Sequence, residues 1–524
     1  MPKENVIHHV LIANRGEIAI RIARAATEAG IATTAIYATD DANSLHVQRA
    51  DNAVALAGVG PAAYLDIDGV VAAAKEAGAD AIHPGYGFLS ENAAFAEAAA
   101  AAGLTFVGPS PAALGAFGDK ANARRLAIEC NVPVIPGTDG PTNPEEARTF
   151  FKELGPGGAV MVKAVAGGGG RGMRPVTDID QLEDALARCA SEAEAAFGDG
   201  GVYLEQLIPD ARHIEVQVAA DQEGNVVVLG DRDCSLQRRR QKIVEVAPAP
   251  GLTEGQRAAF HQHAADLTKA AEYSGLGTVE FLLGGDGTLA FIEFNARLQV
   301  EHTVTEAVTG LDLVRLQFDI ANGESIAHVT PHAPWGTAIQ ARVNLETMET
   351  DGGARPGGGD IAAFEPPAGP GLRVDHFGYA GYRTSPRYDS MLAKVIVHSP
   401  SNDMSDCAAK TGRALSEFRL DGAPSNLSFL QAVLARPEWE TYGFDVAFIE
   451  REAATLVEAA AAMPRPHFGQ DSDEGAAAAR LAGAKVDEAD PLAVLDHGRA
   501  QSSEDASGDF SSEDGYVLQA PMQG

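Results

Sequence analysis

A lysine and a run of glycines stand together in KAVAGGGGRGM (163–173). The apolar run GAVMVK ends at Lys163, and it is followed by the glycines Gly167, Gly168, Gly169 and Gly170. Unhindered backbone N–H groups can turn toward anionic oxygens, so a strand, a glycine loop and a cation together favour a phosphate clamp. A flexible spacer is the alternative, but the preceding strand and an acidic amphipathic helix near 178–197 argue against it. Because the spacing is not G-x-x-x-x-G-K-S/T, any ATP held here is held in a fold other than the P-loop.

Oxygen donors of the kind that Mg²⁺ prefers lie in GTVEFLLGGDGTLAFIEFN (277–295). The two apolar runs around GGDG predict a hairpin, in which a turn centred on the middle of GGDG places Glu280 opposite Phe291. Phe291, Glu293 and Asn295 then share one face, and Glu280 and Glu293 are diagonal neighbours within reach of one cation. Two glutamates facing water are the alternative, but Asn295 and the following ARLQVEH add polar groups that a plain exposed face does not need.

Two further segments offer polar groups for an anionic ligand. In HIEVQVAAD (213–221), His213, Glu215 and Gln217 alternate with apolar residues, so this strand has a polar face that points toward a site or toward water. QRRRQK (237–242) is a basic cluster, which by itself is typical of a solvated charge run. The formal net charge of the chain is -33, so an anionic ligand needs a local cationic pocket.

The elements that must position these residues begin with a βαβ unit in HHVLIANRGEIAIRIARAATEAGIATTAIYATDD. The pattern predicts a strand, a helix and a strand at residues 10–13, 17–29 and 34–37. Only Gly16 stands where a dinucleotide fingerprint has three glycines, which argues against a nicotinamide site. Further strands end at HPGYG (83–87) and TFVGPS (105–110), where α/β sheets place ligand loops, although turn formation alone would also explain His83, Gly85 and Tyr86.

Length and composition exclude several classes of protein. A chain of 524 residues predicts three or more packed units. Its four cysteines include no C-x-x-C pair, which argues against a disulfide framework or a thiolate metal site and favours a reducing cytoplasm. The sequence has neither a signal-peptide pattern nor the roughly 20 apolar residues of a membrane span. With the negative charge, these features predict a cytoplasmic protein without nucleic-acid or membrane partners.

The composition changes after about residue 450. QSSEDASGDFSSEDG (501–515) has five acids, no bases and one aromatic residue, so we expect a linker. The chain then ends on YVLQAPMQG, which begins as a strand for which the sequence offers no partner. We therefore expect a further module beyond it.

These segments together resemble the biotin carboxylase component of biotin-dependent carboxylases, which belongs to the ATP-grasp superfamily. The resemblance covers roughly residues 5–446. It is carried, in family order, by LIANRGEIAIRI, HPGYGFLSEN, FGDKANAR, VKAVAGGGGRGM, HIEVQV, GDRDCSLQRRRQK, GTVEF, FIEFNARLQVEHTVTE and YDSMLAK.

The resemblance and the composition of the C-terminal region imply an α/β (α+β) fold with three domains, followed by a linker and the start of a truncated fourth domain. These are a Rossmann-like N-terminal domain (5–116), an ATP-grasp domain (117–330) with a lid at about 135–207, a β-rich C-terminal domain (336–446), a helical and then acidic linker (447–515), and the start of a biotinyl carrier domain (516–524).

The resemblance also implies roles for individual residues. For ATP, Lys120, Lys163 and Gly167 to Gly170 would hold the phosphates, Glu205 and Ile208 would line the adenine, and His213 and Gln237 would lie near the ribose. Glu280, Glu293 and Asn295 would hold two Mg²⁺ or Mn²⁺ ions. Bicarbonate and biotin would be held by Lys242, Arg297, Gln299, the backbone of Val300, Tyr86, Gly87 and Arg342, with Glu301 as the base and Arg342 stabilising the biotin enolate.

Two positions depart from the family pattern. Arg240 replaces a histidine beside the nucleotide contacts, and Ala296 stands where relatives often have proline or threonine. Neither change removes a proposed metal or proton-transfer group.

The resemblance implies the first half-reaction of an acyl-CoA carboxylase, in which bicarbonate and ATP carboxylate biotin through carboxyphosphate. The expected partners are a biotin carboxyl carrier domain and a carboxyltransferase, in the same chain or another, and a homodimer or larger assembly. Acetyl-CoA, propionyl-CoA or a longer acyl-CoA could be the final acceptor, as could pyruvate in a pyruvate carboxylase-like enzyme. A carbamoyl-phosphate or carboxylate–amine ligase would lack the RLQVEH pairing, and a non-catalytic ATP-binding regulatory module would not need Glu301, Lys242 and Arg342.

Overall fold

Five parallel strands form the N-terminal sheet, in the order β3-β2-β1-β4-β5. The computed structural model describes residues 6–463 except 139, 156, 166–172 and 331–332, and also residues 485–486 and 516–517. The strands of this sheet are β1 (His9–Ile12), β2 (Ala32–Tyr37), β3 (Asn52–Ala55), β4 (Ala81–His83) and β5 (Thr105–Phe106). The helices of this region are α1 (Gly16–Glu28), α2 (Pro61–Tyr64), α3 (Ile67–Glu76) and α4 (Ala93–Ala101), with the 3₁₀ helices η1 (Thr39–Asp41) and η2 (Leu45–Gln48).

Helix α1 follows β1 because apolar residues recur at helical spacing. Ile18 and Ile22 are buried and pack in one core with Val10 and Ile12 of β1. The first turn of α1 therefore lies at the carboxyl end of β1, and it carries the buried Glu17. The predicted βαβ unit is confirmed, with its element boundaries displaced by one or two residues.

An eight-stranded sheet in the order β13-β12-β9-β10-β11-β14-β19-β18 runs through the middle of the chain. Its strands are β9 (Arg212–Ala220), β10 (Val226–Arg238), β11 (Gln241–Ala247), β12 (Gly275–Leu283), β13 (Leu289–Asn295), β14 (Thr337–Asn344), β18 (Leu372–His376) and β19 (Met391–Ser399). Strands β11 and β14 pair antiparallel, with Val244 opposite Ala341. The sheet is therefore continuous across the boundary predicted between residues 330 and 336.

Helices and small sheets surround this sheet. The helices are α5 (Pro111–Gly118), α6 (Lys120–Glu129), α9 (Glu254–Ala270), α10 (His302–Thr309), α11 (Leu313–Ala321), α12 (Met404–Glu417), α13 (Leu427–Leu434), η4 (Pro437–Trp439) and α14 (Phe448–Ala461). Two short antiparallel pairs join β15 (Glu346–Met348) to β16 (Ala354–Pro356) and β17 (Ala363–Glu365) to β20 (Arg419–Asp421). The mixed α/β fold that was predicted is confirmed.

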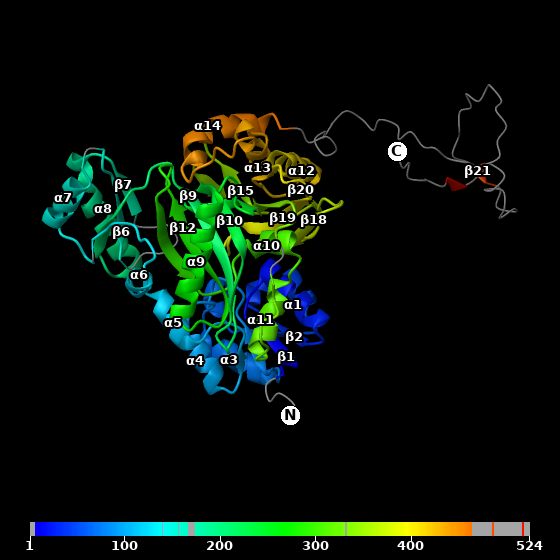
Figure 1. Ribbon diagram of the computed structural model, residues 1–524. Helices are drawn as coiled ribbons and strands as arrows, with labels where there is room; N and C mark the ends of the chain where they lie inside the picture. Colours follow the sequence, from blue (N-terminus) through cyan, green and yellow to red (C-terminus); the bar gives the residue numbers. More distant parts are fainter. Residues whose placement is uncertain are drawn as a thin grey trace, which may run out of the picture. The chain divides into compact units, whose positions relative to one another are not determined.

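A smaller three-stranded sheet with two helices has its own apolar core. Its elements are α7 (Pro144–Glu153), β6 (Val160–Ala164), β7 (Met173–Val176), η3 (Ile179–Gln181), α8 (Leu182–Phe197) and β8 (Val202–Gln206). Asn143 and Glu146 form a capping box at the start of α7, and Pro144 occupies its first turn. Figure 1 shows this group to the side of β9 and β12. The predicted glycine loop 167–170 falls between β6 and β7 and lies outside the described residues.

The β12–β13 hairpin has a different register from the one predicted. Glu280 pairs directly with Glu293, whereas Phe281 pairs with Phe291, and the register shifts between the two pairs. Ile292 is therefore an extra residue in β13, a bulge that a period-2 rule does not anticipate. The prediction that Glu280 lies opposite Phe291 was wrong, and the two glutamates are direct rather than diagonal neighbours.

The chain divides into two units, residues 1–467 and residues 468–524. Within the second unit, β21 (Lys485–Val486) pairs antiparallel with β22 (Tyr516–Val517). The prediction that the last strand lacks a partner was therefore wrong. The acidic segment 501–515 lies outside the described residues. In the described part of the chain, no helix has both the length and the apolar character needed to cross a membrane.

Candidate active site

Glu301 lies between two cations. Its Oε1 accepts a hydrogen bond from Lys242 Nζ at 2.8 Å, and its Oε2 accepts one from Arg342 Nη2 at 3.1 Å. Lys242 comes from β11 and Arg342 from the adjacent β14, whereas Glu301 is the residue before α10. Three segments distant in the sequence are thus brought together because β11 and β14 pair.

Each proton of the Lys242 ammonium group has a carboxylate partner. Besides Glu301, Nζ donates to Glu280 at 2.8 Å and to Glu215. Burial by itself would raise the pKa of Glu301, but the charges of Lys242, Arg342 and Arg232 together outweigh it and lower the pKa. The Glu301 side chain is therefore held as a buried carboxylate, which is the form that can accept a proton.

Arg232 supports this cluster and was not among the predicted site residues. It is fully buried, and its guanidinium donates to Glu215 at 3.0 Å and to Gln299 Oε1 at 2.8 Å. Glu215 therefore joins Arg232 to Lys242. The alternation in HIEVQV had placed Glu215 on a polar face, whereas nothing in GDRDCS signals that its arginine is buried.

Glu280, Glu293 and Asn295 converge at the end of the β12–β13 hairpin. Asn295 Nδ2 lies 2.9 Å from Glu280 Oε1 and 3.3 Å from Glu293 Oε1. Burial and the neighbouring charge of Glu280 raise the pKa of Glu293, although Lys120 acts in the opposite direction. Glu280 is buried and Glu293 is partly buried, and the two carboxylates face each other beside the side-chain amide of Asn295. They fit a divalent cation, because hard oxygen donors are its preferred ligands and its charge would relieve their repulsion.

A second acidic grouping, His213, Glu215 and Glu280, also has ligand atoms within 4.8 Å of one another. Glu215 is already engaged by Arg232 and Lys242, so it is a structural anion rather than a free metal ligand. His213 Nε2 lies 3.0 Å from Glu280 Oε2. Burial opposes protonation of His213, but Glu280 and Glu215 together outweigh it and raise the pKa of the imidazole to about 9.

His213 and Gln237 are adjacent, as expected for residues of one subsite. Gln237 Nε2 lies 2.9 Å from His213 Nδ1 and also donates to the carbonyl of Cys234 at 2.8 Å. Both side chains are buried on β9 and β10. This arrangement fixes the orientation of the imidazole.

Three of the residues predicted to hold bicarbonate, Arg297, Gln299 and Val300, lie in the segment after β13. Arg297 forms an ion pair with Glu91 at 2.9 Å and donates to Asn295 Oδ1 at 2.7 Å. Gln299 donates to Glu280 Oε1 at 2.7 Å. The structure therefore places Arg297 and Gln299 beside the carboxylate pair and next in the chain to Val300 and Glu301.

The residues predicted to hold ATP are less closely connected. Lys163 on β6 pairs with Glu205 on β8, so the smaller sheet carries its own ion pair. Lys120 is the first residue of α6, and its charge offsets part of the rise in the pKa of Glu293. Ile208 lies against the hairpin turn, since a Cβ placed on Gly284 would come within 2.9 Å of it.

Tyr86 and Gly87 lie in a turn that is held in place by hydrogen bonds from the N-terminal βαβ unit. Asn14 Nδ2 donates to the carbonyls of Pro84 and Tyr86, at 2.7 and 2.8 Å. Gly87 has φ +69° and open space where a Cβ would stand. The conformation of HPGYG is therefore set by the asparagine of the NRGE segment.

Arg240 is at the tip of the β10–β11 hairpin, with φ +66°. Its Nη2 lies 3.0 Å from the sulfur of Met161 on β6. The departure from the family pattern thus places the guanidinium against the smaller sheet.

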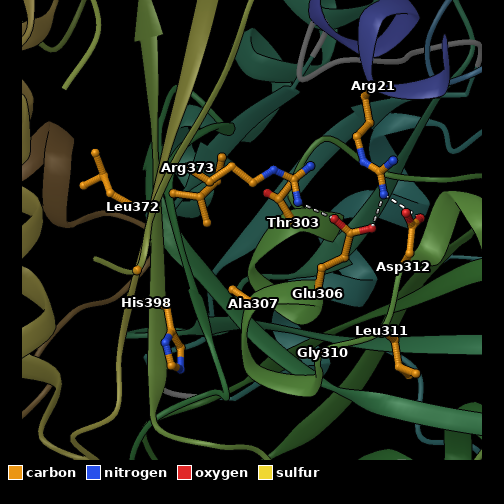
Figure 2. A pocket seen from close by; sticks show the side chains of 12 residues that line it. Arg21, Thr303, Glu306, Ala307, Gly310, Leu311, Asp312, Leu372, Arg373 and His398 are labelled. Atoms are coloured by element: carbon orange, nitrogen blue, oxygen red, sulfur yellow. Dashed lines mark hydrogen bonds and ion pairs between the residues drawn. The ribbon is translucent and has the colours of Figure 1, made fainter. Parts of the chain in front are cut away.

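Figure 2 shows a pocket of about 400 Å³ at a different place, beside α10, β18 and β19. Its arginines are paired: Arg21 with Glu306 and Asp312, and Arg373 with Glu306. Among the described residues, those that line this pocket include none that was predicted for the site. The pocket is therefore separate from the cluster around Glu301.

Sequence models of three domain families match consecutive parts of the chain. Residues 6–114 match the biotin carboxylase N-terminal domain, residues 119–329 match the carbamoyl-phosphate synthase L chain ATP-binding domain, and residues 340–451 match the biotin carboxylase C-terminal domain. The match to the middle family indicates the ATP-grasp class. The two flanking matches narrow this class to proteins with biotin carboxylase domains.

Three relatives agree with this order of domains. The chain is 46% identical to the biotin-dependent acyl-coenzyme A carboxylase alpha3 subunit of Mycobacterium leprae, over 82% of this chain and 71% of that protein. It is 44% identical to a biotin carboxylase of Nostoc, over 84% of this chain and 98% of that protein. Identity to pyruvate carboxylase 1 of Caenorhabditis elegans is 46% over 86% of this chain, which spans only 38% of that protein.

Solved structures give the same result. The biotin carboxylase domain dimer of Hydrogenobacter thermophilus 2-oxoglutarate carboxylase, in complex with MgADP and bicarbonate, is 38% identical with a TM-score of 0.81, over 86% of this chain and 99% of that one. A single-chain, multi-domain long-chain acyl-CoA carboxylase is 45% identical with a TM-score of 0.76, over 87% of this chain and 43% of that one.

The fold and the site define an ATP-grasp ligase. Within that class, the chain belongs to the biotin carboxylase family. It is an enzyme that uses ATP to carboxylate biotin.

Proposed function

We propose that this chain catalyses the first half-reaction of an acyl-CoA carboxylase, carboxylating biotin on a carrier domain. The observation that best supports this reaction is the position of Glu301. It is a buried carboxylate that Lys242 contacts at 2.8 Å and Arg342 contacts at 3.1 Å. Bicarbonate must lose its proton next to ATP, and both reactants are anions. A base held between two cations suits this step, because the cations offset the negative charge.

In the proposed mechanism, Lys242, Arg297, Gln299 and the backbone of Val300 hold bicarbonate. Glu301 takes its proton, so that the resulting oxyanion can attack the γ-phosphorus of ATP in line. Collapse of the carboxyphosphate releases CO₂ and phosphate, and closure of the lid excludes water from this step. The released phosphate takes the ureido N–H proton of biotin, and the resulting enolate forms its N–C bond to CO₂. Arg342 forks hydrogen bonds to the biotin oxygen on which the negative charge develops, and Tyr86 and Gly87 form the adjoining wall.

The ATP side of the site is assigned on the same basis. Lys120, Lys163 and the loop 167–170 would hold the phosphates, and Glu205, Ile208, His213 and Gln237 would surround the nucleoside. Glu280, Glu293 and Asn295 would hold Mg²⁺ or Mn²⁺, two ions in all, whose positive charge would offset that of the ATP phosphates. The carboxylate pair and the MgADP in the Hydrogenobacter relative support Mg²⁺.

We also propose the domain boundaries predicted from the sequence, 5–116, 117–330 and 336–446, with 447–515 as the linker and 516–524 as the start of a carrier domain. The family matches at 6–114, 119–329 and 340–451 support the first three. A carrier and a carboxyltransferase, in the same polypeptide or a partner, would complete the reaction, and a homodimer is the proposed assembly. The cytoplasm is the proposed location.

Pyruvate is the second candidate acceptor, because identity to pyruvate carboxylase 1 equals that to the acyl-CoA carboxylase subunit. The acyl-CoA assignment is supported by the larger share of the relative that the chain covers, 71% against 38%.

The test begins with ADP release by the 524-residue chain with MgATP, with and without bicarbonate and free biotin. We expect release that depends on bicarbonate and rises with biotin, together with transfer of labelled bicarbonate to biotin. Absence of bicarbonate-dependent release would contradict the proposed roles. With a carboxyltransferase partner, transfer of the label to acetyl-, propionyl- or long-chain acyl-CoA would support the acyl-CoA assignment, and transfer to pyruvate alone would refute it.

A further inference from the structure

Lys394 in the YDSMLAK segment is a fully buried lysine whose role is not explained by the mechanism above. It lies on β19, directly opposite Arg342 on β14 and Asp375 on β18. Directly paired residues of antiparallel strands share a face of the sheet, so Lys394 lies on the same face as Arg342. A buried ammonium group is costly unless it is fully paired, so its contacts are informative.

One contact of Lys394 reaches the segment that carries the base. Its Nζ donates to the main-chain carbonyl of Val300 at 3.1 Å. That carbonyl and the N–H of Glu301 belong to one planar peptide unit. Holding the carbonyl therefore fixes the orientation of this peptide plane. The orientation of the plane in turn constrains the Val300 backbone and the direction of the Glu301 side chain.

A second contact of Lys394 reaches the opposite wall of the site. Its Nζ lies 3.1 Å from Glu17 Oε1 in the first turn of α1, and the same carboxylate accepts a hydrogen bond from the Tyr86 hydroxyl. Lys394 Nζ also lies 5.8 Å from the centre of the Tyr86 ring. Glu17 thus links the lysine to the wall that contains Tyr86.

We propose that Lys394 is a positioning residue that sets the distance between the base, Glu301, and the biotin-side wall at Tyr86. Its ammonium group connects Val300, which precedes the base, to Glu17, which orients Tyr86, and it does so from the strand next to Arg342. This inference rests on the proposed roles of Val300, Glu301 and Tyr86. Lys394 of the YDSMLAK segment and Glu17 of the NRGE segment would then act together. They would hold β19, the first turn of α1 and the segment at Val300 in fixed relative positions.

The test compares Lys394→Met with the double variant Glu17→Gln/Lys394→Met. The single change leaves Glu17 as a buried carboxylate without its cation, whereas the double change removes both charges, which is often near neutral for stability. We expect the folded double variant to lose about 10²-fold in kcat for bicarbonate-dependent ADP release, because a misplacement of about 1 Å has that cost. The Kd of MgATP, measured by calorimetry, should stay within about twofold, since no nucleotide contact is changed.

Lys410→Met is the matched control. Lys410 Nζ also donates to a main-chain carbonyl of β19, that of His398, at 2.7 Å, but this contact lies away from Val300. The control should keep the kcat of the wild-type chain. A folded double variant with wild-type kcat, or one that loses nucleotide affinity and kcat together, would overturn the assignment of Lys394. Absence of bicarbonate-dependent release by the wild-type chain would instead reject the proposed function on which it rests.

Discussion

At the scale of single residues, the site is defined by the sharing of a few carboxylates among cations. Lys242 donates to Glu215, Glu280 and Glu301, and Arg342 shares Glu301 with it. Because every ammonium proton is used, a change in any one carboxylate redistributes the contacts of the others. Effects of substitutions in this cluster should therefore be non-additive.

Replacing Glu301 with Gln removes the base and keeps its size. We expect kcat for bicarbonate-dependent ADP release to fall by about 10² to 10⁴-fold, which is the range for loss of a general base. Nucleotide affinity should be retained, as calorimetry with MgATP would show. Glu324→Gln, on the loop after α11, is the control and should leave both quantities unchanged; equal turnover in the two variants would refute the role of Glu301.

Glu293→Gln tests the metal assignment. Burial and Glu280 raise the pKa of Glu293, so a divalent ion that relieves this repulsion should depend on its carboxylate. We expect the Mg²⁺ concentration for half-maximal activity to rise at least about 10-fold, the lower end of the effect of losing a group that supports a metal. Titration of ADP release with Mg²⁺ measures this shift, and an unchanged titration curve would show that the ion binds elsewhere.

At the scale of elements, the β12–β13 hairpin decides where the two glutamates meet. The extra residue Ile292 converts the diagonal arrangement expected from strict alternation into a direct pair, Glu280 opposite Glu293. The hairpin is backed by aromatic packing, in which Phe117 and Phe294 stack with ring centres 3.9 Å apart. The position of the metal ligands thus depends on a core that lies behind them.

Gly277→Ala should disturb this core. A Cβ at Gly277 would come within 2.6 Å of the Phe294 ring, so the ring must move. We expect the free energy of unfolding to fall by about 1–3 kcal/mol, as for overpacking of a core. Thermal and denaturant unfolding would measure the loss. Gly115→Ala on α5, where a Cβ would have nothing within 4 Å, is the control and should be neutral or stabilising.

At the scale of the whole molecule, stability should depend on pH through buried neutral histidines. Burial lowers the pKa of His46 to about 4, although Asp41 opposes the shift. The ring lies between Ser44 Oγ at 2.9 Å and the carbonyl of Ile36 at 3.0 Å. Burial likewise lowers the pKa of His83 to about 3.

The sign of the effect follows from these directions. The unfolded chain binds protons at these histidines below about pH 6.5 while the folded chain does not, so stability is lost as the pH falls from about 6.5 toward 4. For His46 the loss at pH 5 is on the order of 2 kcal/mol. Melting temperatures of the wild-type chain and of His46→Gln between about pH 7.5 and 5 would measure it. An equally steep pH dependence in the variant would contradict the contribution of His46.

Much of the site could be predicted because local patterns determine local structure. The first βαβ unit, the polar face of β9 and the hairpin that carries Glu280 and Glu293 all follow from the order of residues, since hydrophobic periodicity and turn residues act over a few positions. The resemblance added the family, which the comparisons confirmed. Roles such as those of Ile208 and Lys120 remain predictions.

How these segments meet depends on the folded chain. The pairing of β11 with β14 brings Lys242 and Arg342 to Glu301, the bulge at Ile292 sets the glutamate register, and β19 brings Lys394 to Val300. No local pattern indicates that Arg232 is buried. Strand pairing between distant segments and the burial of paired charges depend on the packing of the entire sheet, so no short stretch of sequence specifies them.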